Sequence, residues 1–254
     1  MSLDALLGGS VYVFLMIFVR VGSAFLIMPG YGEQFVSPRI RLLLALLISF
    51  ILMPLMLPDM PAAPSRPGDL ALLVIAEALI GIFLGTIARF MMAALETAGM
   101  LIANQVGLSA AQSFNPAMSG AGNAVSAVLS MLALMLIFAT DLHHLLLLAV
   151  VDSYSLFRPG EWLPLGDAAQ HLARVLGDSF LVGMQLAAPF VVIGLLFYLG
   201  LGLIARLVPQ IQVFFVGIPI QIVLGLLLLG LSLTALMTYW LNRFEGQLIN
   251  ILQP

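Results

Sequence analysis

Four charged residues stand inside long apolar stretches of this chain: Arg20, Glu77, Arg89 and Asp141. A charge at the centre of a membrane-embedded helix costs about 2.5–3.5 kcal/mol, so four such charges facing lipid would cost on the order of 10 kcal/mol. We therefore expect them to face protein or water and to pair with one another or with backbone carbonyls. Two interpretations stay open, a polar pathway through the protein or buried ion pairs that fix the register of the helices. Glu77 and Arg89 are too far apart along one helix to pair, so they need partners from other helices or subunits.

His143 and His144 follow Asp141 closely, and imidazole and carboxylate groups are common zinc ligands. Adjacent residues on a helix point about 100° apart, however, and Asp141 is poorly placed as a third ligand. We favour a helix-packing or interfacial role and expect no metal site. The chain has no Cys, which excludes disulfides, thiolate metal sites and thiol nucleophiles. No cofactor and no catalytic residue is expected.

The elements around these charges must be apolar helices. Of the 254 residues, 62% are hydrophobic and only 8% are charged, whereas soluble domains are about 45–50% apolar and about 25% charged. So few charges cannot cover a water-exposed surface, and lipid or apolar subunits must cover the rest. The net charge of −3 gives no reason to expect a nucleic-acid partner. Composition thus predicts an all-α integral membrane protein.

Six apolar stretches are long enough for membrane helices, which need about 20 residues. They are Leu3–Met28, Arg41–Leu57, Leu70–Leu95 (continuing toward Gln105), Ala124–Val151, Phe180–Ala205 and Ile220–Leu241. A proline-rich connection precedes Asp69, which we expect to cap the third helix. Asp167 and Gln170 resemble a capping box that opens a short amphipathic turn. The spacing of Gly81 and Gly85 is consistent with close helix packing.

Two segments interrupt this pattern. Gly107–Gly122 reads GLSAAQSFNPAMSGAG, which is too polar to span a membrane and too rich in glycine for a stable helix, so we expect a loop. The second interruption, within Val208–Pro219, predicts a broken helical hairpin near the C-terminus. The residues that mark this predicted break are Pro209, Gln210, Phe214, Phe215, Gly217 and Pro219.

Three stretches carry a resemblance to the FliR family of flagellar type III export-gate proteins, called SctT in injectisomes. RVGSAFLIMP at Arg20–Pro29, followed by Pro38–Arg41, resembles the family's N-terminal hairpin. AGMLIANQVGLSAAQSFNP at Ala98–Pro116 resembles its central segment, and RLVPQIQVFFVGIPIQI at Arg206–Ile222 its C-terminal signature. Many relatives carry an acidic residue at the position of Asn104 and Asp-Pro at that of Asn115 and Pro116.

The resemblance implies a single helical domain over residues 1–254, with a FliP-like part over about 1–175 and a FliQ-like hairpin over about 176–254. It implies assembly with FliP-like and FliQ-like subunits, a FlhB-like switch protein and unfolded export substrates, at the flagellar basal body in the bacterial inner membrane. Packing between subunits would then bury Arg20, Glu77, Arg89, Asp141 and Arg206. A plug or gate would consist of Ser109, Ala110, Ala111, Gln112, Ser113, Phe114, Asn115, Pro116 and Met118, which can close a narrow axis with small and deformable side chains.

Two other classes of protein also have interrupted helices and buried charges. An ion-coupled secondary transporter of a small solute is the alternative, although such proteins usually show an internal repeat and this chain does not. A membrane-embedded enzyme is disfavoured, because the sequence has no Cys, no Lys, no HExxH and no paired-carboxylate motif. We therefore expect a non-enzymatic subunit of a protein export channel.

Overall fold

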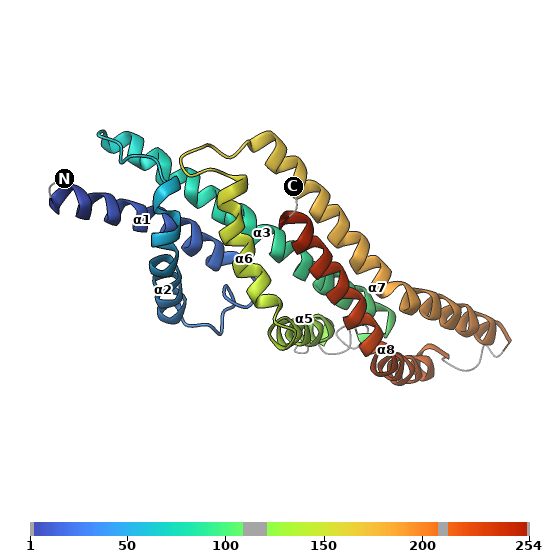
Figure 1. Cartoon of the computed structure of the whole chain (residues 1–254). Coiled ribbons are helices and arrows are strands. Elements are labelled where there is room, and N and C mark those ends of the chain that lie inside the picture. Colours follow the sequence, from blue (N-terminus) through green and yellow to red (C-terminus); the bar gives the residue numbers. More distant parts are fainter. Residues whose placement is uncertain (1–2, 109–120, 208–212, 253–254) are drawn as a thin grey trace. The chain divides into compact units, whose positions relative to one another are not determined.

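The structure is a computed structural model that describes residues 3–108, 121–207 and 213–252. Its elements are α1 (Leu3–Ile27), α2 (Pro38–Met56), the 3-10 turn η1 (Leu57–Asp59), α3 (Pro67–Gln105), α5 (Ala121–Ala139), α6 (Leu142–Leu156), α7 (Leu165–Leu207) and α8 (Val213–Leu252). Within the described ranges every regular element is helical (Figure 1). The predicted all-α fold is confirmed.

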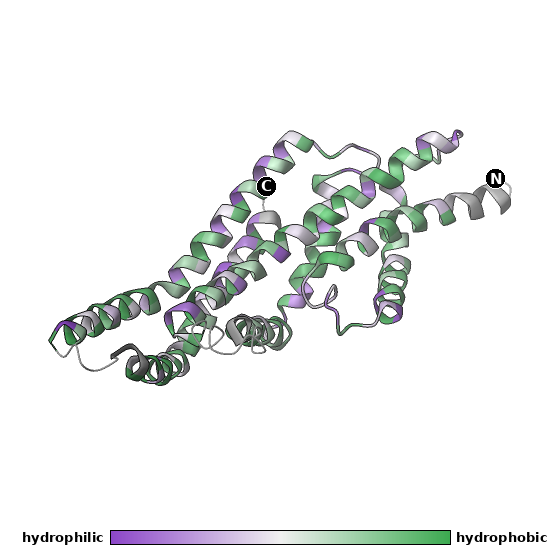
Figure 2. Cartoon of the chain, turned by 180° about the vertical axis from the view of Figure 1, so that it is seen from behind, coloured by the Kyte–Doolittle hydropathy of each residue, from purple (hydrophilic) through white to green (hydrophobic). Residues whose placement is uncertain are grey.

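Five helices are long and apolar enough to cross a membrane, and a sixth span is possible if α5 and α6 together count as one broken span. Figure 2 shows how apolar residues dominate along these helices. The 39 residues of α3 and the 43 residues of α7 give lengths of about 58 and 64 Å at about 1.5 Å per residue. Both lengths exceed the roughly 30 Å hydrocarbon core of a bilayer. The chain is a membrane protein whose longest helices are longer than a single perpendicular crossing requires.

The chain divides into two compact units. Unit 1 comprises Met1–Phe90, Ile137–Leu176 and Phe244–Pro254, and unit 2 comprises Met91–Leu136 and Gly177–Arg243. Four helices, α3, α5, α7 and α8, contribute residues to both units. This division does not follow the predicted boundary between FliP-like and FliQ-like parts, and that boundary stays a prediction.

One predicted helix, Ala124–Val151, is wrong, because the chain bends there. Asp141 adopts a left-handed conformation (φ 59°, ψ 13°) that no α-helix can contain. Helices α5 and α6 meet at this residue with a bend of 76°. The chain has no proline or glycine at the bend, but the polar residues Thr140, Asp141, His143 and His144 interrupt the apolar run there.

The observed ends of several helices also differ from the predicted ones. Helix α2 begins at Pro38, and the hydroxyl of its N-cap Ser37 accepts from the Ile40 amide at 3.4 Å. Helix α3 begins at Pro67, so Asp69 lies in the first turn and is not the cap. The predicted turn at Asp167 is not separate from the following span, because α7 is one helix rich in good helix formers such as Ala, Leu and Arg.

The C-terminal helix also differs from the prediction. Helix α8 begins at Val213 and contains Pro219, whereas we expected the final helix to start after that proline. Pro54 and Pro189 likewise lie inside α2 and α7. Interior prolines are tolerated in membrane helices, where neighbouring groups satisfy the backbone that they free.

Candidate functional site

Arg20 and Glu77 form an ion pair that joins α1 to α3 in unit 1. Nε of Arg20 donates to Oε2 of Glu77 at 2.5 Å, and the two side chains are 0% and 1% exposed. Because neither group reaches water within the chain, the arrangement favours an ion pair that fixes helix register over a polar pathway. Desolvating two charges is expensive, and such a pair persists only where further hydrogen bonds satisfy it.

Those further bonds come from α6 and the connection after it. Nη1 of Arg20 donates to Oγ of Ser153 and Nη2 donates to the carbonyl of Phe157, both at 3.2 Å. The guanidinium lies 3.9 Å from the centre of the Tyr154 ring, a distance typical of a cation–π contact. We call Arg20, Glu77, Ser153 and Tyr154 the Arg20 cluster. It ties three helices of unit 1 together through one buried charge.

Glycines bring α1 and α3 close enough for this ion pair. A Cβ on Gly81 would overlap the backbone carbonyl of Arg20 and the hydroxyl of Ser23. A Cβ on Gly85 would lie 2.9 Å from the carbonyl oxygen of Ala24. The predicted close packing of Gly81 and Gly85 is confirmed. Since Glu77 lies one turn before Gly81, the same close crossing places its carboxylate beside Arg20.

A second ion pair joins α3 to the turn between α1 and α2. Nη1 of Arg89 donates to Oε1 of Glu33 at 2.6 Å, with side chains 41% and 16% exposed. The guanidinium of Arg41 donates to the carbonyls of Tyr31 and Glu33 at 2.8 and 3.0 Å. Arg89 therefore has a partner on this chain, although its own side chain stays partly open.

Aromatic packing holds this turn in place. Tyr31 stacks on Phe25 with ring centres 4.6 Å apart and meets the edge of Phe138 at 6.4 Å. Burial raises the pKa of the Tyr31 hydroxyl above its ordinary value, because the charged phenolate is disfavoured away from water. Gly30 has φ 84° and lies against the Phe138 ring, so a side chain there would be strained.

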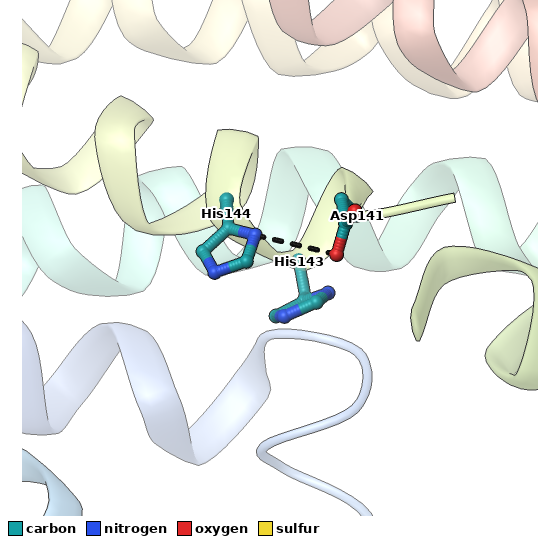
Figure 3. A group of neighbouring side chains, drawn as sticks. All are labelled: Asp141, His143 and His144. Carbon is teal, nitrogen blue, oxygen red and sulfur yellow. Dashed lines mark ion pairs between the residues drawn. The ribbon is translucent and has the colours of Figure 1, made fainter. Parts of the chain in front are cut away.

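Asp141 and Arg206 differ from the other charges because both are exposed on this chain. The carboxylate of Asp141 lies 3.6 Å from Nδ1 of His144, and the two side chains are 78% and 64% exposed. In Figure 3 the rings of His143 and His144 and this carboxylate gather at the start of α6. Burial of Asp141 or Arg206 would require other subunits, and that part of the prediction stays a prediction.

In unit 2, the side chain of Gln221 hydrogen-bonds the backbone carbonyl of the last residue of α3. Its Nε2 donates to the carbonyl of Gln105 at 2.7 Å and to the Tyr198 hydroxyl at 3.2 Å. The last carbonyls of a helix have no partner within the helix, so this bond acts as a cap. Gly107 follows with φ 82° and packs against the Gln221 side chain.

Other contacts of unit 2 also use backbone carbonyls of α3. The buried indole of Trp240 donates to the carbonyl of Met91 at 2.9 Å. The hydroxyl of Ser126 donates to the carbonyl of Glu96 at 3.0 Å, and a Cβ on Gly99 would overlap the backbone of Ser126. Helices α5 and α8 thus both pack directly on this part of α3.

Helices α7 and α8 lie side by side and run in opposite directions within unit 2. The Tyr239 hydroxyl donates to Oε1 of Gln185 at 2.5 Å, and a Cβ on Gly217 would lie 2.7 Å from the Leu201 side chain. Pro209 and Gln210 lie outside the described residues, so the predicted break between the two helices stays a prediction. Phe214, Phe215, Gly217 and Pro219 belong to α8.

All nine residues of the predicted plug, from Ser109 to Met118, also lie outside the described residues. Several residues that organise the described part were not predicted as sites: Glu33, Ser153, Tyr154, Gln221 and Trp240. Gln221 offered a signal, since an amide between two isoleucines of an apolar helix needs a hydrogen-bond partner. Ser153 and Tyr154 offered none, because nothing in their local sequence points to Arg20.

Comparison with known proteins decides the family. Residues 11–247 match the family described as "Bacterial export proteins, family 1". The flagellar biosynthetic protein FliR of Caulobacter vibrioides is 45% identical over 235 residues, which are 92% of this chain and 94% of that protein. The chain belongs to the FliR family. The FliR proteins of Bacillus subtilis (30% identical, 91% of this chain and 90% of that protein) and Escherichia coli (31% identical, 88% and 85%) are also similar over most of both chains.

The FliR family is the one that the three sequence stretches indicated. The N-terminal stretch at Arg20–Pro29 contains the guanidinium of the Arg20 cluster, and the C-terminal stretch contains Gln221, which caps α3. Both stretches therefore include a polar residue that joins helices within the chain. In this member of the FliR family, Arg20 and Gln221 lie in the stretches that resemble the family and also form hydrogen bonds between helices of the chain.

Proposed function

We propose that this protein is a non-enzymatic structural and gating subunit of the flagellar type III protein export channel. It assembles with FliP-like and FliQ-like subunits into the entry pore for unfolded export substrates and contacts a FlhB-like switch protein. Its place is the bacterial inner membrane at the flagellar basal body. The observation that carries this proposal is the match to a bacterial export family over residues 11–247, with relatives named as flagellar biosynthetic proteins.

The uncovered apolar surface supports assembly with other subunits. Only 22% of the residues in the most apolar window of α7, and 17% in that of α8, are buried within the chain. Side chains such as Leu203, Leu207, Leu227 and Leu231 project from these two helices without cover. Lipid or neighbouring subunits must bury them, since contiguous exposed apolar surface of this extent marks an interaction site.

Helix length supports the same proposal. Helices of about 58–64 Å cannot lie entirely within a hydrocarbon core of about 30 Å unless they tilt strongly. Apolar residues outside the bilayer would need protein around them. A hetero-oligomeric helical assembly with FliP-like and FliQ-like subunits provides such surroundings.

Crosslinking through introduced cysteines tests the assembly, and because the chain has no natural Cys, each label on this chain lies at the introduced position. Leu203→Cys and Leu231→Cys, at exposed positions of α7 and α8, are labelled in cells with a thiol-reactive benzophenone. We expect light-induced adducts with FliP-like or FliQ-like subunits. Ala187→Cys, at a buried position, is the matched control and should stay unlabelled. Absence of protein adducts at both exposed sites in cells that still swim would overturn the proposed assembly.

Gating is tested separately by shortening the segment within residues 110–120. The composition of this segment cannot support a fold of its own, so removing part of it should open the pore to small ions and dyes while assembly and most export persist. Deletion of Ala62 and Ala63 in the exposed proline-rich connection is the control, and it should leave permeability unchanged. Unchanged permeability with export abolished would make the segment part of the transport machinery, not a plug.

A further inference from the structure

The bend between α5 and α6 gathers three groups that can bind a metal. The carboxylate of Asp141 and the imidazoles of His143 and His144 each offer a ligand atom, and these atoms all lie within 4.8 Å of one another. The two imidazole rings lie 4.1 Å apart between centres. Figure 3 shows both rings and the carboxylate close together at the start of α6. The sequence argument that adjacent histidines diverge therefore does not hold at this helix terminus.

Asp141 reaches the histidines because of its backbone. As the residue before α6 in the left-handed conformation, it turns the chain so that its carboxylate lies 3.6 Å from Nδ1 of His144. With zinc–ligand distances of about 2.0–2.1 Å, neighbouring donors of a tetrahedral site lie about 3.3 Å apart. One pair is thus already near that spacing, and rotation of the side chains can bring the third donor in.

His143 supplies an independent observation. Its Nδ1 is buried and has no hydrogen-bond partner among the described residues, whereas its ring lies against Phe138 at 5.1 Å. A buried ring nitrogen without a partner is costly in an apolar environment. Coordination of a metal would remove that cost, and packing on Phe138 already limits the ring's freedom.

We propose that Asp141, His143 and His144 form a binding site for a divalent transition metal of the zinc class, with a fourth position left for water or another ligand. Two imidazoles and one carboxylate are a ligand set suited to zinc and poorly suited to magnesium or calcium. A bound ion would link the residue at the bend to the first turn of α6. It would thereby stabilise the left-handed backbone of Asp141, the residue at which α5 and α6 meet.

Zinc binding by the full chain in detergent tests the site, with a histidine-free affinity tag. Titration with Zn²⁺ should show one site per chain, with affinity at least tenfold weaker in His144→Ala. Asp141→Asn should also bind more weakly, while asparagine tolerates the left-handed backbone and keeps the bend. His171→Ala is the matched control, since His171 is the third histidine of the chain and lies outside the site. Equal affinity in wild type and His144→Ala, or equal loss in His171→Ala, would overturn the proposal.

A spectroscopic measurement on the wild-type chain avoids dependence on any variant. Zinc K-edge X-ray absorption of the zinc-loaded protein should show imidazole scattering from two histidines together with oxygen ligands. A spectrum with oxygen ligands alone would mean that zinc binds elsewhere. That outcome would exclude the site even if every variant proved hard to purify, and it would leave the proposed role in export untouched.

Discussion

The two halves of α3 are held by different kinds of contact. In its first half, within unit 1, the helix offers charged side chains: Glu77 pairs with Arg20 and Arg89 pairs with Glu33. In its second half, within unit 2, it offers backbone carbonyls to Trp240, Ser126 and Gln221 on other helices. Glycines bring neighbours close in both halves, so close packing alone does not separate them.

The two kinds of contact differ in how much stability the chain loses when a mutation removes one of the interacting side chains. A buried charge without its partner is strongly destabilising, because the remaining charge cannot reach water. The carbonyls of Met91 and Glu96 lie inside α3 and keep their bonds within the helix when the side-chain donor is lost, so the loss is limited to one hydrogen bond. The stability of the chain should therefore depend steeply on Glu77, whose pair with Arg20 is fully buried. It should depend more mildly on the partly exposed pair of Arg89 and on the contacts in the second half of α3.

The largest expected effect is that of Glu77→Ala. This change leaves the Arg20 guanidinium buried and unpaired, and we expect a loss of about 3–5 kcal/mol of folding free energy. That amount is a large part of the roughly 5–15 kcal/mol that stabilises a typical domain. The measurement is the midpoint of thermal aggregation in detergent, together with the amount of chain that accumulates in membranes.

A double variant distinguishes pairing from packing. Arg20→Met combined with Glu77→Leu removes both charges, so the chain should recover most of the stability lost in Glu77→Ala. A double variant no more stable than Glu77→Ala would show that the Arg20 cluster contributes through its shape and its bonds to Ser153 and Phe157, not through charge pairing.

Glycine substitutions give the next effect in size. Gly81→Ala and Gly99→Ala both place a methyl group against a neighbouring backbone, which costs about 1–3 kcal/mol through overpacking. Gly81→Ala should cost more, because separating α1 from α3 also stretches the ion pair of Arg20. Gly177→Ala, with open space around it, is the control and should stabilise the helix by about 0.5–1 kcal/mol. Equal losses at Gly81 and Gly99 in the same thermal assay would mean that the ion pair adjusts without cost.

Hydropathy was enough to predict most of the helices, because a long apolar run in this composition has no other stable state in lipid. The partner of Arg20 could not be predicted, since Glu77 is 57 positions away and only the crossing of α1 and α3 brings the two together. The bend at Asp141 had a local signal that was missed, because polar residues interrupt the apolar run there and aspartate is one of the few residue types that adopt the left-handed conformation. Close packing at Gly81 was predictable because the spacing of small residues reports directly on helix contact.

A smaller effect is expected in the second half of α3. Trp240→Phe removes the indole donor to the Met91 carbonyl and should cost about 1–2 kcal/mol, from one hydrogen bond and some lost packing. Tyr239→Phe removes a hydroxyl that bonds Gln185 at an exposed position, and should change the thermal midpoint very little. A loss for Trp240→Phe as large as that for Glu77→Ala would erase the proposed contrast between the two halves.

The smallest expected effect is at the partly open pair of Arg89 and Glu33. Exposed ion pairs contribute about 0–1 kcal/mol, and salt weakens them further. A double-mutant cycle with Glu33→Gln and Arg89→Gln, measured at low and high salt on the purified chain, should give a coupling energy in this range that falls as salt rises. The cycle isolates this pair even if Arg89 has other neighbours.

Repeating that cycle in the presence of FliP-like and FliQ-like subunits sharpens the comparison. If the assembly covers the open side of Arg89, water leaves the pair, salt loses its effect and the coupling grows toward that of a buried pair. A coupling energy that stays small and salt-sensitive with the partners bound would place this side of α3 at a water-filled surface of the assembly. Arg89 would then line the assembly's aqueous face, while Arg20 alone would fix the packing of unit 1.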